Sequence, residues 1–330
     1  MLLGGSLTAR RWTSYACFWL FYVRKSTIRQ GPTIDPLSDV LRHLRLRARV
    51  FLHTDFCGRW AVDTSGQYTA TFHLVADGRA WLHRDGEAPL AVGSGELVVF
   101  PHDARHVLSH SPEPPDPNLI NRIGGVGPGE ATRLVCGYIE FDRVRGNPVL
   151  EALPPMVHMD PATAGEGLAG IRQLLLAELE RERPGGEAAV ERLTDLLVIE
   201  VMRAFGQDTQ AHSGFLAALR DPAVHRALAA IHADPGHPWQ VGELARLAAL
   251  SRSAFAGRFR RLVGQTPAQY VTRWRMQLAS ERLRSGGEPV AALAEELGYA
   301  SEAAFRKAFR REMGCGPGRL RRPGPGEGSP

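Results

Sequence analysis

The sequence predicts an α+β protein, with a β-barrel or sandwich in its N-terminal half and an all-α C-terminal part. Short segments rich in β-branched and aromatic residues, separated by turn signals, run up to about residue 141. After residue 165 the apolar residues recur at intervals of three and four, as in amphipathic helices. A helical pattern also repeats within the last ninety residues. A chain of 330 residues is long enough for two domains, each with its own core.

The composition is that of an ordinary globular protein, with 44% hydrophobic and 23% charged residues. Four cysteines are too few and too scattered for a disulfide scaffold and fit a reducing compartment. The nine apolar residues at 15–23 fall short of the roughly 20 that a membrane span needs, and no signal-peptide cleavage site follows. We therefore expect a cytoplasmic protein without a membrane partner, and interpret residues 1–33 as a disordered or non-native extension, with export as the lesser alternative.

The positive charge is concentrated near the C-terminus. Residues 222–322 contain 17 Lys and Arg against 8 Asp and Glu, a net charge of +9, whereas the whole chain carries +5. This asymmetry indicates that only the C-terminal part meets a polyanion.

Five strands are predicted in the N-terminal half. They cover residues 69–75, 79–84, 95–101, 106–110 and 132–141, with turn signals such as ADG and VGSG between them. The Pro- and Gly-rich stretch at 111–130 is predicted to be a loop. Strands this short and this closely spaced favour a barrel or sandwich.

Helices follow from residue 165 onward. Two amphipathic helices are predicted over 168–183 and 188–205, broken at the PGG of residues 184–186. A polar stretch at 206–214 indicates a linker, and helices are expected after Asp221.

An internal repeat occupies the C-terminal part. SRSAFAGRFRRLVGQTP (251–267) matches SEAAFRKAFRREMGCGP (301–317) at a fixed offset of 50 residues. A short amphipathic helix precedes each copy, beginning at Val241 and at Val290. Each unit is therefore predicted to be a helix, a tight turn and a second helix.

Each second helix begins at a capping serine, Ser251 or Ser301. The residues expected to face the core are Phe255, Phe259 and Leu262 in the first copy and Phe305, Phe309 and Met313 in the second. Between the copies, Thr266 as N-cap and Pro267 as first residue predict a linker helix of about 18 residues, roughly 27 Å long. That length suits two helices held near one groove repeat of roughly 34 Å.

The opposite face of each second helix combines small residues with cations, which allows close approach to a DNA groove. The predicted DNA-binding residues are Arg252, Ser253, Ala256, Gly257, Arg260, Arg261 and Thr266 in and after the first copy, and Glu302, Ala303, Arg306, Lys307 and Arg310 in the second. This is a helix-turn-helix arrangement, in which the second helix enters the major groove. A solvated bundle without DNA binding is the alternative, and the aligned caps, aromatics and Gly-x-x-Pro endings argue against it.

The segment LARLAALSRSAFAGRFRRLVGQTPAQYVTRWRMQLASERL, with VAALAEELGYASEAAFRKAFRREMGCGPGRL after it, resembles the DNA-binding domain of AraC/XylS-family transcriptional regulators. The resemblance covers about residues 222–322 and implies a bipartite site in double-stranded DNA, with RNA polymerase as a further partner. Gly257 departs from the family, which often has a longer polar side chain there. Readout by the first helix is therefore expected to depend more on Arg252, Ser253 and Arg260.

GELVVFPHDARH (95–106) is similar to the second motif of cupin barrels, with Asp103 in place of its second glycine and His106 at the metal-binding position. The first cupin motif, His-x-His, is missing, and only His73 stands in its region. The N-terminal half thus resembles the cupin-type sensor domain of AraC-family regulators. That resemblance implies an unknown effector and a homodimer formed through the helices at 165–205.

Cys57, His73, His106 and Cys136 are the candidate metal or redox residues of this half. If the four converge in the barrel, their two sulfur and two nitrogen atoms suit a tetrahedral zinc ion. The resemblance extends to members that sense reactive chlorine or other oxidants through paired cysteines, which implies a Cys57–Cys136 disulfide on oxidation. Buried, inert core cysteines and an organic ligand site unrelated to sulfur remain alternatives.

The predicted organisation follows from these elements. It comprises an extension at 1–33, a cupin-like sensor at 34–160, dimerisation helices at 161–206, a linker at 207–220, a DNA-binding domain at 221–322 and a disordered tail at 323–330. We expect a transcriptional regulator that senses a small molecule, metal or oxidant, and not an enzyme. The alternative, a metal-dependent cupin enzyme fused to a DNA-binding domain, lacks a His-x-His motif and an acid/base pair.

Overall fold

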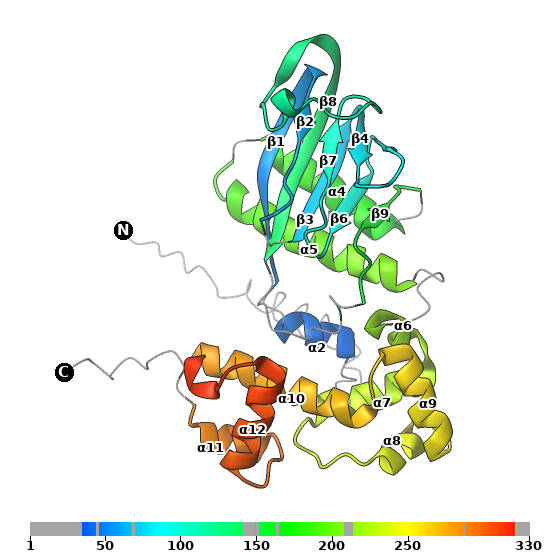
Figure 1. The fold of residues 1–330 in the computed structure, drawn as a ribbon, viewed down its shortest axis with the longest axis vertical. Helices are drawn as coiled ribbons and strands as arrows, with labels where there is room; N and C mark the ends of the chain where they lie inside the picture. The colour runs from blue at the N-terminus through cyan, green and yellow to red at the C-terminus, as the bar shows by residue number, and fades with distance from the viewer. Residues whose placement is uncertain are drawn as a thin grey trace, which may run out of the picture. The chain divides into compact units, whose positions relative to one another are not determined.

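The N-terminal half contains two antiparallel sheets and the C-terminal part is helical (Figure 1). A computed structural model of the chain describes residues 35–43, 46–67, 70–140, 149, 152–162, 165–181, 183–207, 214–286 and 288–320. The predicted extension at 1–33, the predicted tail at 323–330 and Cys17 lie outside these residues. Among the described residues, no helix combines the length and apolar character needed to cross a membrane.

The strands pair into a five-stranded sheet, in the order β1-β8-β3-β6-β9, and a four-stranded sheet, in the order β2-β7-β4-β5. Their bounds are β1 Arg47–Arg59, β2 Ala61–Val62, β3 Ala70–Asp77, β4 Arg79–His83, β5 Leu90–Gly93, β6 Leu97–Phe100, β7 Val107–Ser109, β8 Gly125–Glu140 and β9 Val157–Met159. All five predicted strands are confirmed.

Each face of the five-stranded sheet packs on a different partner. On β3 and β8, Phe72, Leu74 and Val135 belong to one core cluster, which also contains apolar residues of the helices that follow the barrel. Their neighbours in the chain, Val75 and Leu134, belong to a second cluster with residues of the four-stranded sheet. Because side chains alternate across a strand, every second residue of β3 and β8 faces the barrel interior.

The helices are α2 Pro36–His43, α4 Gly165–Leu179, α5 Gly186–Gln207, α6 Phe215–Arg220, α7 Pro222–Ala233, α8 Val241–Leu247, α9 Arg252–Val263, α10 Pro267–Ser285, α11 Val290–Glu296 and α12 Glu302–Met313. Short 3-10 turns, η1 Pro117–Leu119 and η2 Pro317–Arg319, complete the described elements. The helices predicted from the 50-residue repeat, the linker helix and the two helices after the barrel are confirmed.

The structure differs from the prediction in the loop at 111–130. Its second half belongs to β8, which begins at Gly125 and pairs with the end of β1. The glycine content of this stretch predicted a loop, but in the structure the glycines allow the backbones of β1 and β8 to approach each other closely. A Cβ on Gly129 would lie 2.8 Å from Gly58 Cα, and one on Gly58 would lie 2.4 Å from the Gly127 carbonyl oxygen.

A second difference concerns the predicted linker at 207–220, because residues 215–220 form α6. Phe215, Leu216 and Ala218 of α6 are buried. Six residues are fewer than two helical turns, too short for apolar periodicity to be recognised. α2, with eight residues or just over two turns, and the two-residue strand β2 are also too short to be recognised from periodicity.

Side-chain caps begin the C-terminal helices as predicted. Ser251 accepts a hydrogen bond from the Ala254 amide, Ser301 accepts one from the Ala304 amide, and Thr266 forms a capping box with Gln269. Left-handed glycines, Gly264 and Gly314, end α9 and α12. These caps satisfy the backbone groups that each helix end leaves without intrahelical partners.

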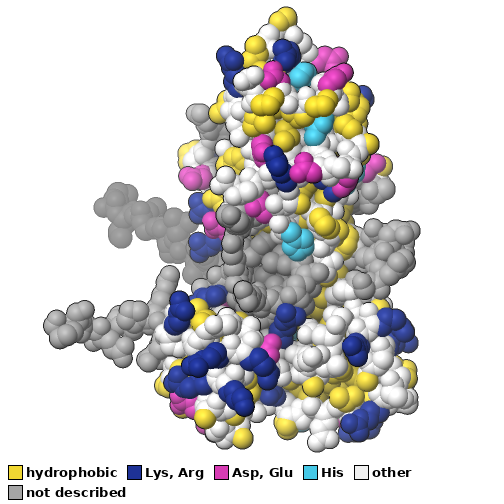
Figure 2. All heavy atoms as spheres, viewed as in Figure 1, with side chains coloured by type: hydrophobic (Ala, Val, Ile, Leu, Met, Phe, Trp, Pro, Cys, Tyr) yellow, Lys and Arg dark blue, Asp and Glu magenta, His cyan; other side chains and the backbone are white. Residues whose placement is uncertain are grey.

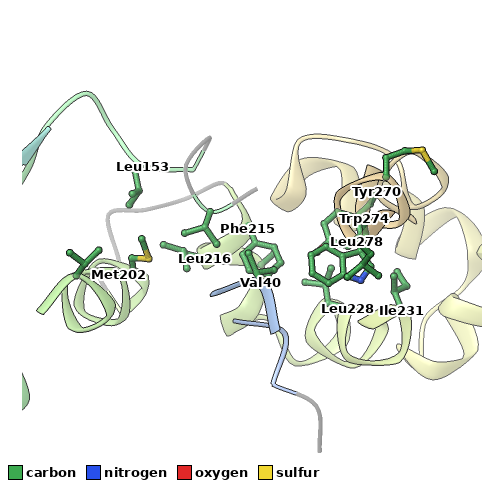
Figure 3. Packing of buried hydrophobic residues seen from close by; sticks show 14 of the residues in the cluster. Val40, Leu153, Met202, Phe215, Leu216, Leu228, Ile231, Tyr270, Trp274 and Leu278 are labelled. Atoms are coloured by element: carbon green, nitrogen blue, oxygen red, sulfur yellow. The ribbon is translucent and has the colours of Figure 1, made fainter. Parts of the chain in front are cut away.

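Apolar side chains of α2, α6, α7 and α10 meet in one buried cluster (Figure 3). Val40, Phe215, Ile231, Tyr270 and Trp274 are among its members. Rings pack closely there, with the His232 and Trp274 centroids 4.1 Å apart. The cluster anchors the N-terminal helix α2 on the helices that support the first repeat copy.

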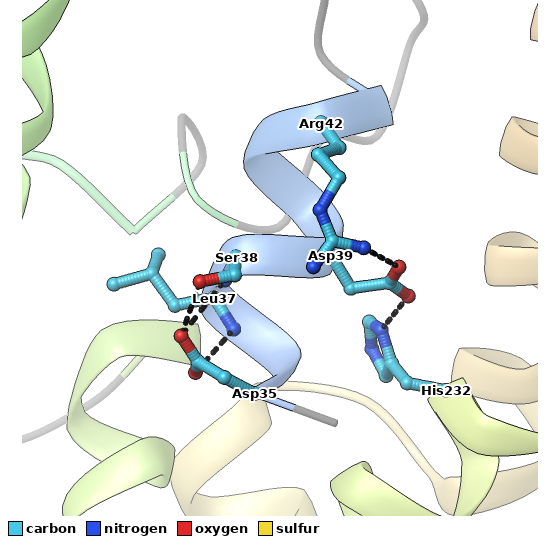
Figure 4. Close-up of polar contacts among 6 residues, drawn as sticks. All are labelled: Asp35, Leu37, Ser38, Asp39, Arg42 and His232. Atoms are coloured by element: carbon cyan, nitrogen blue, oxygen red, sulfur yellow. Dashed lines mark hydrogen bonds and ion pairs between the residues drawn. The ribbon is translucent and has the colours of Figure 1, made fainter. Parts of the chain in front are cut away.

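A polar chain crosses this apolar cluster (Figure 4). His232 Nδ1 donates to the Asp39 carboxylate at 2.9 Å, and the Tyr270 hydroxyl donates to His232 Nε2 at 2.7 Å. Burial raises the pKa of Tyr270 well above its usual value, so the phenol stays protonated and remains a donor. Asp35 caps the start of α2 by accepting from the Leu37 and Ser38 amides.

Candidate functional site

The predicted core and surface faces of α9 and α12 are confirmed. Phe255, Phe259, Phe305 and Phe309 are fully buried. The opposite faces are exposed at Arg252, Ser253, Gly257, Arg260 and Arg261 of α9 and at Ala303, Arg306, Lys307 and Arg310 of α12, whereas Ala256 and Glu302 are half-buried. In the view of Figure 2, Lys and Arg side chains gather over the C-terminal helices with few acidic side chains among them.

Two classes of cationic side chain can be distinguished in this part of the chain. One class holds the fold together: Arg258 bonds Asp221 at 2.6 Å, Arg275 donates to the carbonyls of Pro235 and His237, and Arg282 pairs with Glu288 and Glu296. The other class, Arg252, Arg260, Arg261, Lys307 and Arg310, has no ion pair among the described residues. Only the second class is available to neutralise phosphates or to contact base edges without breaking a bond.

Arg306 is an exception among the predicted contacts. Its Nε donates to the Glu302 carboxylate at 2.6 Å, one helical turn earlier. Contact with DNA would have to compete with this i,i+4 ion pair, which is worth about 0.3–0.5 kcal/mol when exposed.

Gly257 presents bare backbone on the exposed face of α9. An added Cβ there would meet no atom within 4 Å, so packing inside the chain does not require glycine. The position is therefore a flat patch on the helix, flanked along the chain by the exposed cations Arg252 and Arg260.

Thr266 is the N-cap of the linker helix, as predicted, and its contact with DNA stays a prediction. Its hydroxyl donates to Gln269 Oε1 at 2.9 Å and accepts from the Gln269 amide at 3.3 Å. Both hydrogen-bonding roles of the hydroxyl are thus used within the chain. The linker helix α10 that it caps has 19 residues and is about 28 Å long.

In the barrel, the structure brings three of the four candidate metal or redox residues together. His73 on β3 lies directly opposite Cys136 on β8, and its Nδ1 is 2.9 Å from the Cys136 sulfur. His73 Nε2 is 2.9 Å from His106 Nε2, and Thr64 Oγ1 lies 3.1 and 3.3 Å from these two nitrogens. Asp103 has a φ of 55°, the left-handed turn expected from the cupin-like motif, and it leads the chain to His106.

The hydrogen-bond directions in this cluster follow from one carbonyl. His106 Nδ1 lies 2.7 Å from the Ala104 carbonyl, which can only accept, so Nδ1 carries the proton. Burial lowers the pKa of both His73 and His106, which keeps the rings neutral. His106 Nε2 is then an acceptor for His73 Nε2–H, and His73 Nδ1 accepts from the Cys136 thiol. The cluster is a neutral chain of donors and acceptors.

Cys57 does not join this cluster. It is exposed on β1, where it pairs with Ala131, whereas Cys136 pairs with Leu52. Five residues of strand separate the two cysteines by roughly 16 Å, and a disulfide requires Cα atoms within about 7 Å. The expected convergence of four residues, and with it a Cys57–Cys136 disulfide within the barrel, is therefore contradicted by the strand register.

The residues present do not fit a zinc ion. The two histidine Nε2 atoms face each other, but the Cys136 sulfur lies on the opposite, Nδ1, edge of the His73 ring. Burial also raises the pKa of the Cys136 thiol far above its ordinary value, whereas zinc binds the thiolate. Within the described part of the chain, no group of three or more His, Cys, Asp or Glu could hold a metal.

A cavity of about 550 Å³ lies at the barrel end next to this cluster. Its walls are Phe51, Leu52, Phe56, Val62, Asp63, Thr64, Gln67, Thr71, Asn121, Ile123, Tyr138 and Glu140. Thr64 belongs both to the cavity wall and to the histidine cluster. The sequence prediction missed this cavity. The signal available was the polar residues at alternate positions of β8, where Cys136, Tyr138 and Glu140 share the interior face.

Comparisons with known proteins agree with both halves of the chain. The cupin family profile matches residues 35–206, more than half of the chain, and the helix-turn-helix domain profile matches residues 244–323. A putative AraC-like transcription regulator of Streptomyces antibioticus is 34% identical over 299 residues, covering 88% of this chain and 99% of the relative. The regulator AlkR of Acinetobacter baylyi is 30% identical over 300 residues, with 86% and 98% covered.

The chain is also similar to a regulator of Escherichia coli and to one solved DNA-binding domain. The RCS-specific transcriptional activator RclR of Escherichia coli is 28% identical over 253 residues, covering 76% of this chain and 83% of the relative. The solved DNA-binding domain of AdpA in complex with a target DNA is 32% identical and covers 30% of this chain and 88% of that domain, with a TM-score of 0.28. The chain belongs to the AraC family of DNA-binding transcriptional regulators, with an N-terminal cupin domain.

Proposed function

We propose that the protein binds a bipartite operator through α9 and α12, and that a small molecule bound in the cupin domain controls this binding. The observation that carries the first part is the pair of capped helices, α9 and α12, which bury matching phenylalanines. On their exposed faces, both helices carry cations that form no ion pair with the described residues. Unpaired cations can replace condensed counterions on DNA without first losing an internal bond.

Support for a small-molecule effector comes from the cavity in the barrel. About 550 Å³ is within the range of small-molecule sites. Its lining combines six apolar or aromatic residues with six polar or charged ones, so it can contact both an apolar ligand body and polar ligand groups. Sensing of oxidants through a Cys57–Cys136 pair is not part of this proposal, because the strand register keeps Cys57 away from Cys136.

Dimerisation through α4 and α5 belongs to the same proposal. Leu174 on α4 is 60% exposed and Leu196 on α5 is 39% exposed. Large apolar side chains at the surface of neighbouring helices are typical of protein interfaces. Two copies would present four helix-turn-helix units to a repeated DNA site.

The experiment is selection of genomic DNA fragments by the full-length protein, followed by footprinting and titration of the enriched site. We expect two protected major-groove segments about one helical turn apart. Binding should weaken steeply with salt, with a slope of about −0.9 per phosphate contact in a double-logarithmic plot. Failure to enrich any sequence over random fragments would contradict the proposed function.

A further inference from the structure

We propose that the cavity in the cupin domain binds an amphipathic amine, a ligand with an apolar body and a cationic nitrogen. This inference rests on the proposed small-molecule control and specifies the chemistry of its effector. Three features of the cavity support it: its apolar wall, a buried hydroxyl that has no partner among the described residues, and the sign of its charged groups.

The apolar wall is aromatic and partly open to solvent. Phe51 and Tyr138 lie on paired strands with their rings stacked at 6.2 Å between centroids. Phe51 is 48% exposed and Ile123 is 72% exposed, so this wall offers apolar surface to a ligand. A hydrocarbon or aromatic ligand body would cover this surface and gain about 25 cal/mol for each Å² removed from water.

A hydroxyl deep in the cavity has no partner among the described residues. Thr71 is 2% exposed and lines the cavity, yet its Oγ1 makes no hydrogen bond with any described group. Buried polar atoms are rarely left without a partner in native proteins, because doing so costs the full desolvation of the group. A polar ligand group that bonds Thr71 would remove this cost. Thr64, which contacts the histidine pair, places a second hydroxyl in the same wall.

The charged groups of the cavity are carboxylates. Asp63 and Glu140 are in its lining, and no Lys or Arg is. Glu140 makes no hydrogen bond or ion pair with the described residues, whereas one oxygen of Asp63 accepts from Ser65. Arg47 pairs with Glu140 in the strand register, but its side chain lines a separate hollow beside Glu191 and Asp195. A ligand carboxylate would thus meet like charges, and a ligand ammonium would meet opposite ones.

Calorimetric titration of the full-length protein with three ligands of equal chain length tests the proposal. Decylammonium, decanol and decanoate are used at pH 7, below the concentrations at which they form micelles. At this pH an alkylamine is cationic, as a lysine side chain is. We expect decylammonium to bind most tightly and decanoate at least about fivefold more weakly, since each exposed charge contact is worth up to about a factor of five.

Variants separate charge from packing. Glu140→Gln should weaken decylammonium about fivefold and leave decanol unchanged, whereas Glu130→Gln, the same change at an exposed position of the same strand, should alter neither. Thr71→Val, which keeps the shape of the side chain, should weaken both ligands about fivefold through loss of a hydrogen bond. Decanoate binding as tightly as decylammonium, equal behaviour of the two glutamate variants, or no binding of any of the three ligands would overturn the proposal.

Operator binding without ligand, measured on the same protein, distinguishes this proposal from the proposed function. If the protein binds its operator but none of the three ligands, the proposed amine effector is wrong and the proposed DNA-binding function stands. If the protein binds decylammonium with the expected preference but the amine leaves its operator affinity unchanged, the amine site is confirmed. Its proposed role in controlling DNA binding is then wrong.

Discussion

The two helix-turn-helix copies share a core and differ on the surface that would face DNA. At the offset of 50 residues, Phe255 and Phe259 match Phe305 and Phe309, and all four are fully buried. On the exposed face, however, Arg252 of α9 corresponds to Glu302 of α12, and Gly257 corresponds to Lys307. The first copy has a flat centre between cations, whereas the second has long charged side chains in the same place.

This difference shows that the repeat conserves what the fold needs and leaves the recognition surface free to vary. Burial and caps impose the same residues on both copies, because phenylalanines that fill the core and serines that start a helix have few substitutes. Nothing inside the chain constrains the outer face, where an added Cβ on Gly257 would meet open space. The two helices are therefore expected to recognise different half-sites.

The largest expected effect tests the shared core. Phe259→Ala and Phe309→Ala should each lower the free energy of unfolding by about 3–5 kcal/mol, through lost burial and an unfilled cavity. Urea denaturation followed by circular dichroism measures both. A copy that tolerates the change with less than half of this loss would show that the two cores are not equivalent.

The next effect tests whether both surfaces contact DNA. Arg260→Ala and Arg310→Ala, at matching positions, should each weaken operator binding by about 1–3 kcal/mol, as expected for an arginine at a base edge. Fluorescence anisotropy with a labelled operator measures the affinity. Arg181→Ala, an exposed arginine after α4, is the matched control and should bind normally. If only one of the two variants loses affinity, a single copy carries recognition.

A smaller effect concerns the flat centre of the first copy. Gly257→Ala should raise the free energy of unfolding by about 1 kcal/mol, because alanine has the higher helix propensity and its methyl group meets no atom of the chain. Operator affinity should fall at the same time if DNA packs against the bare backbone. Thermal unfolding measures the stability and fluorescence anisotropy measures the operator affinity. An operator affinity that stays equal or rises would mean that DNA does not approach α9 at Gly257.

The smallest effect concerns the ion pair of the second copy. Glu302→Gln removes the negative charge that pairs with Arg306 and leaves at most a neutral hydrogen bond, so binding should tighten by about 0.3–0.5 kcal/mol and the salt slope should steepen by up to about 0.9. Glu295→Gln, an exposed change on α11, serves as the control. Weaker binding of Glu302→Gln than of this control would instead show that Glu302 itself contacts the operator.

The C-terminal half was easier to predict from the sequence than the N-terminal half. The repeat, its caps and its inward phenylalanines were predicted because helices are defined by contacts within a few residues. The five predicted strands were also found, but most of β1, the first half of β8, and β2, β5 and β9 were not predicted, since strands depend on partners far along the chain. The cap at Thr266 was predicted for the same reason, because a cap bonds to the backbone of its own helix.

By itself, the sequence determined the helical DNA-binding part, its basic charge and the presence of a barrel, since local periodicity and a duplicated pattern carry that information. Only the tertiary structure decided which polar residues of the barrel meet. Strand register placed His73 opposite Cys136. It left Cys57 five residues along β1 from Leu52, the residue of that strand opposite Cys136, because a shift along a strand separates residues that composition alone would group. Pairing of β1, β8 and β3 in one sheet also brought Phe51, Thr71 and Glu140 around one cavity, a neighbourhood that no local pattern specifies.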